Sequence, residues 1–163
     1  MLKECEEALR LYEGDIVEIG AGNGHNTIEF LKLAKKYNRT VIVIDPFESD
    51  WLSMPASYRY PYSEFEDRVK DYTDILHLHK RSSLCETSEE VCKKTSIAFA
   101  FVDGLQYKGA VLSDLRIVSH AKVIVVDDMD RQTGESQVPS AVHEYIKQTG
   151  KTLLIKDRWA IIT

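Results

Sequence analysis

Short runs of apolar, often β-branched residues alternate along the whole chain with longer segments in which apolar residues recur every three or four positions. The short runs predict seven strands, over residues 15–19, 40–44, 75–79, 97–102, 123–126, 153–156 and 159–162. The longer segments predict six helices, over residues 2–12, 26–37, 63–72, 88–94, 107–119 and 139–149. Regular alternation of this kind is typical of a parallel sheet covered by helices.

The last two predicted strands are joined by just two residues, Asp157 and Arg158. So short a connection forms a hairpin, so we expect the final strand to run antiparallel to its neighbour. Residues 97–102 are almost wholly apolar, which indicates a strand in the middle of a covered sheet. The pattern predicts an α/β fold in one domain, residues 1–163: a doubly wound, seven-stranded, mostly parallel sheet with an antiparallel C-terminal hairpin.

Two residues are candidate caps of the predicted helices. Asn26 stands where the helix over 26–37 begins, with Glu29 three residues later, which is the spacing of a capping box. Gly150 follows the helix over 139–149 and is a favourable C-cap residue.

Composition narrows the class of protein. The 163 residues are 44% hydrophobic and 29% charged with a net charge of −5, which suits a soluble globular domain and gives no electrostatic case for nucleic acid or anionic membranes. No apolar run approaches the roughly 18 residues that span a bilayer, and the charged N-terminus lacks a signal-peptide core. The three cysteines lack metal-ligand spacing. We therefore expect reduced thiols and a cytoplasmic protein.

A glycine cluster, Gly20-Ala21-Gly22-Asn23-Gly24, follows the first predicted strand. Ligands bind at this end of the strands in open parallel sheets, although a tight turn alone would also use glycine. The spacing is not the dinucleotide fingerprint G-x-G-x-x-G, and no Gly-Lys-Ser/Thr follows as in a Walker A loop. Asp45 ends the second strand, where a carboxylate can accept both hydroxyl hydrogens of a ribose.

Glu18-x-Gly20-x-Gly22-x-Gly24 followed by Asp45 resembles motif I and the acidic motif II of class I S-adenosylmethionine methyltransferases. The seven-strand pattern with its terminal hairpin resembles their Rossmann-like fold over nearly the whole chain. The resemblance implies that Asp45 binds the ribose of S-adenosyl-L-methionine and that Ser82 or Ser83 lies near its adenine. The full cofactor set that it implies is Glu18, Gly20, Ala21, Gly22, Asn23, Asp45, Ser82, Ser83 and Asp103.

Three carboxylates end two other strands: Asp103 the fourth, and Asp127 and Asp128 the fifth. Neighbouring strands lie about 4.8 Å apart, so these side chains converge if the two strands are adjacent. Carboxylates this close repel one another unless a cation or protons intervene, and oxygen ligands suit Mg²⁺ or Ca²⁺. The alternative is that each aspartate caps a turn or helix.

Val102-Asp103-Gly104-x-x-Tyr107 and Val125-Val126-Asp127-Asp128 resemble the metal-binding segments of macrocin-type sugar O-methyltransferases, and catechol O-methyltransferases carry a similar set. The resemblance implies that Asp103, Asp127 and Asp128 hold one Mg²⁺. It also implies that Asp103 and Asp127 are catalytic, because a cation lowers the pKa of an acceptor hydroxyl and orients it.

At the positions where both families carry a general base, this sequence has different residues. Leu105 stands where macrocin-type enzymes carry an acidic residue, and Gln106 stands where the catechol type carries a lysine. Neither side chain accepts a proton at neutral pH. Lys108 and His143 are candidate substitutes, although surface roles are common for both residue types.

A long aromatic segment, residues 47–62, contains Trp51, Tyr58, Tyr60 and Tyr62. Connections of this length are usually functional, and aromatic faces bind flat ligands and sugar rings, so we expect a substrate lip or lid. The alternative is that the aromatic residues pack the loop onto the domain.

The leading hypothesis is a metal-dependent O-methyltransferase for a small hydroxylated acceptor, with sugars and glycoconjugates as candidates. The missing base leaves a second hypothesis open, a non-catalytic S-adenosylmethionine-binding regulatory or scaffold domain. A methyltransferase for RNA or protein is the third, and the acidic charge disfavours a nucleic-acid substrate. A second copy of the chain or a fused domain is a candidate partner for acceptor recognition.

Overall fold

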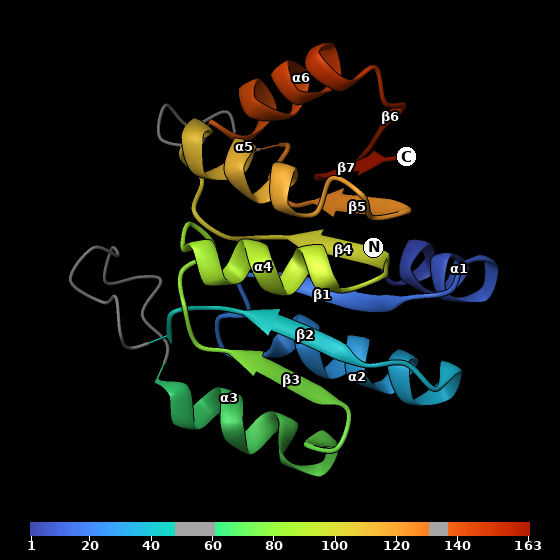
Figure 1. Ribbon diagram of the computed structural model, residues 1–163, viewed down its shortest axis with the longest axis vertical. Helices are drawn as coiled ribbons and strands as arrows, with labels where there is room; N and C mark the ends of the chain where they lie inside the picture. The colour runs from blue at the N-terminus through green and yellow to red at the C-terminus, as the bar shows by residue number, and fades with distance from the viewer. Residues whose placement is uncertain (48–60, 131–136) are drawn as a thin grey trace.

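The computed structural model describes residues 1–47, 61–130 and 137–163 (Figure 1). In this part of the chain one seven-stranded sheet has the order β3-β2-β1-β4-β5-β7-β6. The first five of these strands are parallel, and β7 is antiparallel to both β5 and β6, as predicted for the hairpin. The strands are β1 Asp15–Ile19, β2 Val41–Ile44, β3 Leu76–His79, β4 Ile97–Val102, β5 Val123–Val126, β6 Leu153–Lys156 and β7 Trp159–Ile162.

Helices cover both faces of the sheet, which confirms the predicted doubly wound fold (Figure 1). Alternate residues of β4 point to opposite faces. Phe99 and Phe101 pack with α1, α2 and α3, whereas Ala100 and Val102 pack with α4, α5 and α6. The helices are α1 Leu2–Leu11, α2 His25–Tyr37, α3 Tyr62–Val69 with a 3₁₀ turn over Lys70–Tyr72, α4 Glu86–Lys94, α5 Lys108–Ile117 and α6 Val138–Thr149.

The predicted capping box at Asn26 is wrong. Helix α2 begins at His25, and Gly24 is the N-cap, with no side-chain capping bond. Glu29 instead forms an ion pair with Lys32 at 2.6 Å. Gly24 takes φ +81°, and a Cβ there would lie 3.0 Å from Phe65 Cδ2, so the tight turn into the helix excludes an ordinary capping residue. At the other predicted cap, the Gly150 N–H donates to the Ile146 carbonyl at 2.9 Å, which confirms the C-cap.

The sheet order brings the predicted site residues together. The chain adds strands on one side of β1 through β2 and β3, then crosses to β4 and β5 on the other side. Ligands of open α/β sheets bind at such a switch in strand order. Ile19 is in register with Ile44 on β2 and with Val102 on β4. Because these strands end level with one another, the residues that follow them form one edge.

The three cysteines are unpaired, with Cys5 and Cys92 buried and Cys85 exposed, which agrees with the expectation of free thiols. Within the described ranges, no helix combines the length and apolarity needed to cross a lipid bilayer.

Candidate functional site at the carboxyl edge of the sheet

The loop between β1 and α2 lies tightly against the end of β4. The Gly20 N–H donates to the Ile44 carbonyl at 3.0 Å, and Gly20 takes φ +82°. A Cβ at this position would lie 2.2 Å from the Asp103 carbonyl oxygen, closer than any side chain can tolerate. Glycine is therefore required here both by conformation and by space, so the loop is more specific than an ordinary turn.

Asp45 fixes this loop from the end of β2. Its Oδ2 accepts hydrogen bonds from the backbone N–H groups of Ala21 at 2.7 Å and Gly22 at 3.1 Å, and its Oδ1 accepts one from the Phe47 N–H at 2.6 Å. The side chain is almost completely buried. Burial raises the pKa of Asp45, and the three backbone donors oppose that rise. The structure thus places Asp45 at the glycine loop, where the sequence motif predicts the ribose contact.

Glu18 lies below the loop and is fully buried. Its Oε2 accepts a hydrogen bond from the Thr27 hydroxyl at 2.6 Å, whereas Oε1 has no hydrogen-bond partner among the described residues. Burial raises the pKa of Glu18 to about 8, the Thr27 hydrogen bond opposes this, and the charges of Asp103 and Asp45 add to the rise. Three acidic groups from three strands therefore share one electrostatic environment, which favours a cationic ligand.

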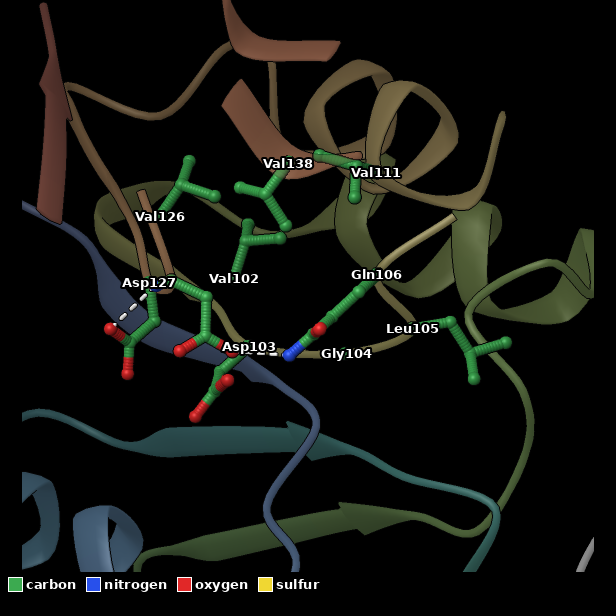
Figure 2. A pocket seen from close by; sticks show the side chains of 10 residues that line it. Val102, Asp103, Gly104, Leu105, Gln106, Val111, Val126, Asp127 and Val138 are labelled. Carbon is green, nitrogen blue, oxygen red and sulfur yellow. Dashed lines mark hydrogen bonds between the residues drawn. The ribbon is translucent and has the colours of Figure 1, made fainter. Parts of the chain in front are cut away.

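The carboxylates of the fourth and fifth strands meet, as predicted. β4 and β5 are neighbours, and the Asp127 N–H donates to the Val102 carbonyl at 3.1 Å. Figure 2 shows the Asp103 and Asp127 side chains projecting to the same side of a pocket, with the Gln106 amide turned toward them. Its lining residues are Val102, Asp103, Gly104, Leu105, Gln106, Val111, Val126, Asp127, Asp128 and Val138.

The guanidinium of Arg158 binds the two aspartates that follow β5, Asp127 and Asp128. Arg158, in the turn between β6 and β7, donates from Nε to Asp127 Oδ1 at 2.5 Å and from Nη2 to Asp127 Oδ2 at 2.9 Å. The same Nη2 donates to Asp128 Oδ1 at 2.6 Å. The Gln106 side-chain amide donates to Asp128 Oδ2. The hydrogen bond to Asp127, with the charges of Asp127, Asp128 and Asp103, raises the pKa of Arg158.

This arrangement does not fit the magnesium ion predicted for Asp103, Asp127 and Asp128. In the described part of the chain, no group of three or more His, Cys, Asp or Glu side chains is arranged to hold a metal. The physical reason is that N–H donors already occupy the oxygens of Asp127 and Asp128. Sequence reasoning missed Arg158 because it treated the two-residue hairpin turn as a connection only.

The candidate general bases are engaged or remote. Lys108 forms an ion pair with Glu144 at 2.6 Å on the surface, and His143 is exposed on α6. Leu105 lines the pocket, and the Gln106 amide donates to Asp128. Neither side chain can serve as a general base. These observations agree with the departure from the families noted in the sequence.

The loop after β3 holds the two serines expected near adenine. The Ser82 carbonyl accepts a hydrogen bond from the Ser88 hydroxyl at 2.8 Å, which fixes the start of α4. Ser83 lies beside Asp114, a fully buried carboxylate of α5 that the sequence analysis missed. Asp114 is three residues after Val111 and four before Val118, two apolar residues of the helix predicted over 107–119, so helical spacing could have found it.

Most of the predicted lip, including Trp51, Tyr58 and Tyr60, lies outside the described residues. Tyr62 begins α3. The centroid of its ring lies 5.1 Å from that of the Phe47 ring. Lys80 Nζ lies 3.3 Å from the Tyr62 ring centroid. Tyr62 thus packs on the body of the domain at the base of the segment.

A doubly wound parallel sheet, a glycine loop after β1 and a carboxylate after β2 together define a Rossmann-like fold that binds a nucleoside-containing cofactor. A family profile described as a methyltransferase domain matches residues 17–129, more than half of the chain. The chain belongs to this methyltransferase family, which confirms the resemblance to class I S-adenosylmethionine methyltransferases.

Solved structures share the fold at low sequence identity. CalS11, a TDP-rhamnose 3′-O-methyltransferase of calicheamicin biosynthesis, matches with a TM-score of 0.74 and 16% identity, covering 99% of this chain and 76% of its own. The O-methyltransferase NovP matches with a TM-score of 0.70 and 15% identity, covering 99% and 78%. TomG of Streptomyces achromogenes, solved with S-adenosylmethionine, gives 0.66 and 13%, covering 99% and 78%. Among curated proteins, none matches this sequence.

Proposed function

We propose that this protein transfers a methyl group from S-adenosyl-L-methionine to a hydroxyl oxygen of a small acceptor, with a sugar or glycoconjugate as the favoured class. The observation that carries the proposal is the row of buried carboxylates behind a glycine loop that Asp45 holds in place. The sugar class is favoured because CalS11, which shares the fold, acts on TDP-rhamnose.

The residues fit the cofactor. S-adenosylmethionine brings an ammonium group and a sulfonium that carries an electrophilic methyl group. Glu18 offers a buried Oε1 that lacks a partner within the described residues, and the charge of Asp103 reaches the same environment. A carboxylate has about four acceptor sites and the backbone donors use three of them, so Asp45 can hold the loop and still accept one hydrogen bond from a ribose hydroxyl through Oδ1.

In this proposal Asp103 acts on the acceptor. Its carboxylate stands at the end of β4 and lines the pocket, beside the loop that would hold the cofactor. The acceptor oxygen forms a bond to the methyl carbon, the carbon–sulfur bond breaks with its electron pair on sulfur, and the hydroxyl proton passes to a base. We assign that base to Asp103, because Gln106 and Lys108 are otherwise engaged. Alignment of the two reactants supplies the rest of the catalysis.

One observation favours the second candidate, a cofactor-binding domain without catalysis. Arg158 donates hydrogen bonds to Asp127 and Asp128, so these two carboxylates are already paired with a cation. Release of S-adenosylhomocysteine with nucleotide sugars or other small hydroxylated acceptors would support the enzyme. Tight cofactor binding without release across a broad acceptor panel would support the binding domain. An absence of cofactor binding by calorimetry would contradict both.

Asp45→Asn is expected to weaken S-adenosylmethionine binding by about 10- to 100-fold, since hydrogen bonds to a charged group contribute roughly 1.5–3 kcal/mol. The amide has one acceptor oxygen, so its NH₂ must face either the glycine loop or the Phe47 N–H. Isothermal titration calorimetry measures the change. Asp67→Asn, at an exposed carboxylate paired with Lys70 on the surface, is the matched control and should bind like the wild type. Equal affinity of the two variants would remove Asp45 from the cofactor site.

A further inference from the structure

The Arg158 guanidinium is built into the carboxyl edge of the sheet. The side chain of Arg158 is 43% exposed, but those of Asp127 and Asp128 are only 10% and 4% exposed. A planar guanidinium that donates two hydrogen bonds to one carboxylate is a directional contact, unlike a surface ion pair between flexible side chains. The contact therefore joins a partly exposed cation to two nearly buried anions.

The backbone also holds Arg158 in place. Its carbonyl accepts a hydrogen bond from the Met129 N–H at 2.8 Å, directly after the aspartate pair. The next strand pairs with β5, with Ala160 in register with Val126. The hairpin turn is thus anchored to the strand that supplies both aspartates, so the backbone of Arg158 is already held beside them.

Each of the four carboxylate oxygens of Asp127 and Asp128 already accepts at least one N–H donor. Asp127 Oδ1 accepts from Arg158 Nε and from the Asp128 N–H at 2.7 Å, and Oδ2 accepts from Arg158 Nη2. Asp128 Oδ1 accepts from Arg158, and its Oδ2 accepts from Gln106. Divalent cations such as Mg²⁺ and Ca²⁺ bind through these same oxygen lone pairs. An incoming ion would have to displace the guanidinium and overcome its charge.

We propose that Arg158 is the resident cation of this site: its guanidinium stands in the place of a divalent metal at Asp127 and Asp128, so that the protein works without one. Arg158 is a positioning residue in this account, since it orients the two aspartates beside Asp103. The inference rests on the proposed function, because methyl transfer is the reaction that this site would serve. Its test, however, measures metal binding and not methyl transfer. Failure of cofactor binding therefore leaves it standing, and its own failure leaves cofactor binding untouched.

The test is a titration of the EDTA-dialysed full chain with Mn²⁺, followed by electron paramagnetic resonance of the free ion. We expect the wild type to show no saturable site with a Kd below about 1 mM, which is the Kd of the weakest protein sites for divalent cations. Arg158→Ala should gain one site per chain that binds at least about 10-fold more tightly, because three carboxylate oxygens lose the guanidinium that they bind. Adding Asp127→Asn to Arg158→Ala should abolish the gained site.

Lys156→Ala is the matched control, because it removes one positive charge from the same hairpin, where Lys156 pairs with Glu4 at 3.2 Å. This variant should show no more metal binding than the wild type. Saturable Mn²⁺ binding by the wild type that disappears in Asp127→Asn would overturn the proposal, as would a folded Arg158→Ala that gains no site. If circular dichroism shows that Arg158→Ala does not fold, the wild-type and Asp127→Asn titrations still decide the question.

Discussion

Gly20→Ala is expected to lower the free energy of unfolding by about 2–5 kcal/mol and to abolish S-adenosylmethionine binding. The loss combines the strain of a left-handed backbone in an L-residue, roughly 1–2 kcal/mol, with overpacking of roughly 1–3 kcal/mol. The overpacking arises because the new Cβ would lie 2.2 Å from the Asp103 carbonyl oxygen, and the end of β4 would have to move. Since that end carries Asp103 and the loop carries the amides bound to Asp45, both halves of the site would shift.

Two other glycines separate these contributions. Gly150 has φ +69° but no heavy atom within 4 Å of a Cβ, so Gly150→Ala should cost only the strain, about 1 kcal/mol. Gly109, in α5, also has free space around a Cβ, and alanine there should raise the free energy of unfolding by up to about 1 kcal/mol. Urea denaturation measures all three, and calorimetry measures cofactor binding. A Gly20→Ala variant no less stable than Gly150→Ala would contradict the close packing described here.

Asp114→Asn is expected to stabilise the protein by about 1–3 kcal/mol at pH 8, the cost of burying a charged group without full compensation. Burial raises the pKa of Asp114 to about 7, and the Ser83 hydroxyl opposes part of that rise. In the unfolded chain the carboxyl titrates near its ordinary pKa of about 3.9. Between these two values the folded state binds the extra proton, so stability falls as pH rises from about 4 to 7 and stays low above that.

The gain from Asp114→Asn should therefore become small near pH 4, where the carboxyl is protonated in the folded state and about half protonated in the unfolded state. Glu18, with its pKa raised to about 8, contributes a loss of the same sign that extends to slightly higher pH. Urea denaturation at pH 4, 6 and 8 tests the prediction, with Asp67→Asn on the surface as control, which should change stability by less than about 0.5 kcal/mol. A variant less stable than the wild type at pH 8 would show that the folded protein uses the Asp114 charge.

The sequence by itself determined the elements and their order. Periods of two and of three to four residues are local properties, so β4 and the amphipathic helices followed from apolar spacing alone. The glycine cluster and the acidic residues after the strands were equally visible. Parallel strands of one sheet present their carboxyl ends together, so the meeting of Asp45, Asp103 and Asp127 at one edge could be predicted without coordinates.

Only the tertiary structure decided which partners these groups have. Arg158 lies 31 residues after Asp127, and no local pattern indicates that β7 inserts beside β5 and brings the guanidinium to the aspartates. The cap at Gly24 likewise depends on Phe65, a residue of α3 whose ring leaves little space for a side chain at position 24. Hydrogen-bond partners and burial are set by residues remote in the chain, whereas the charge and type of each residue are not. For this reason the sequence predicted where the acidic edge lies, but the folded chain determined which cation occupies it.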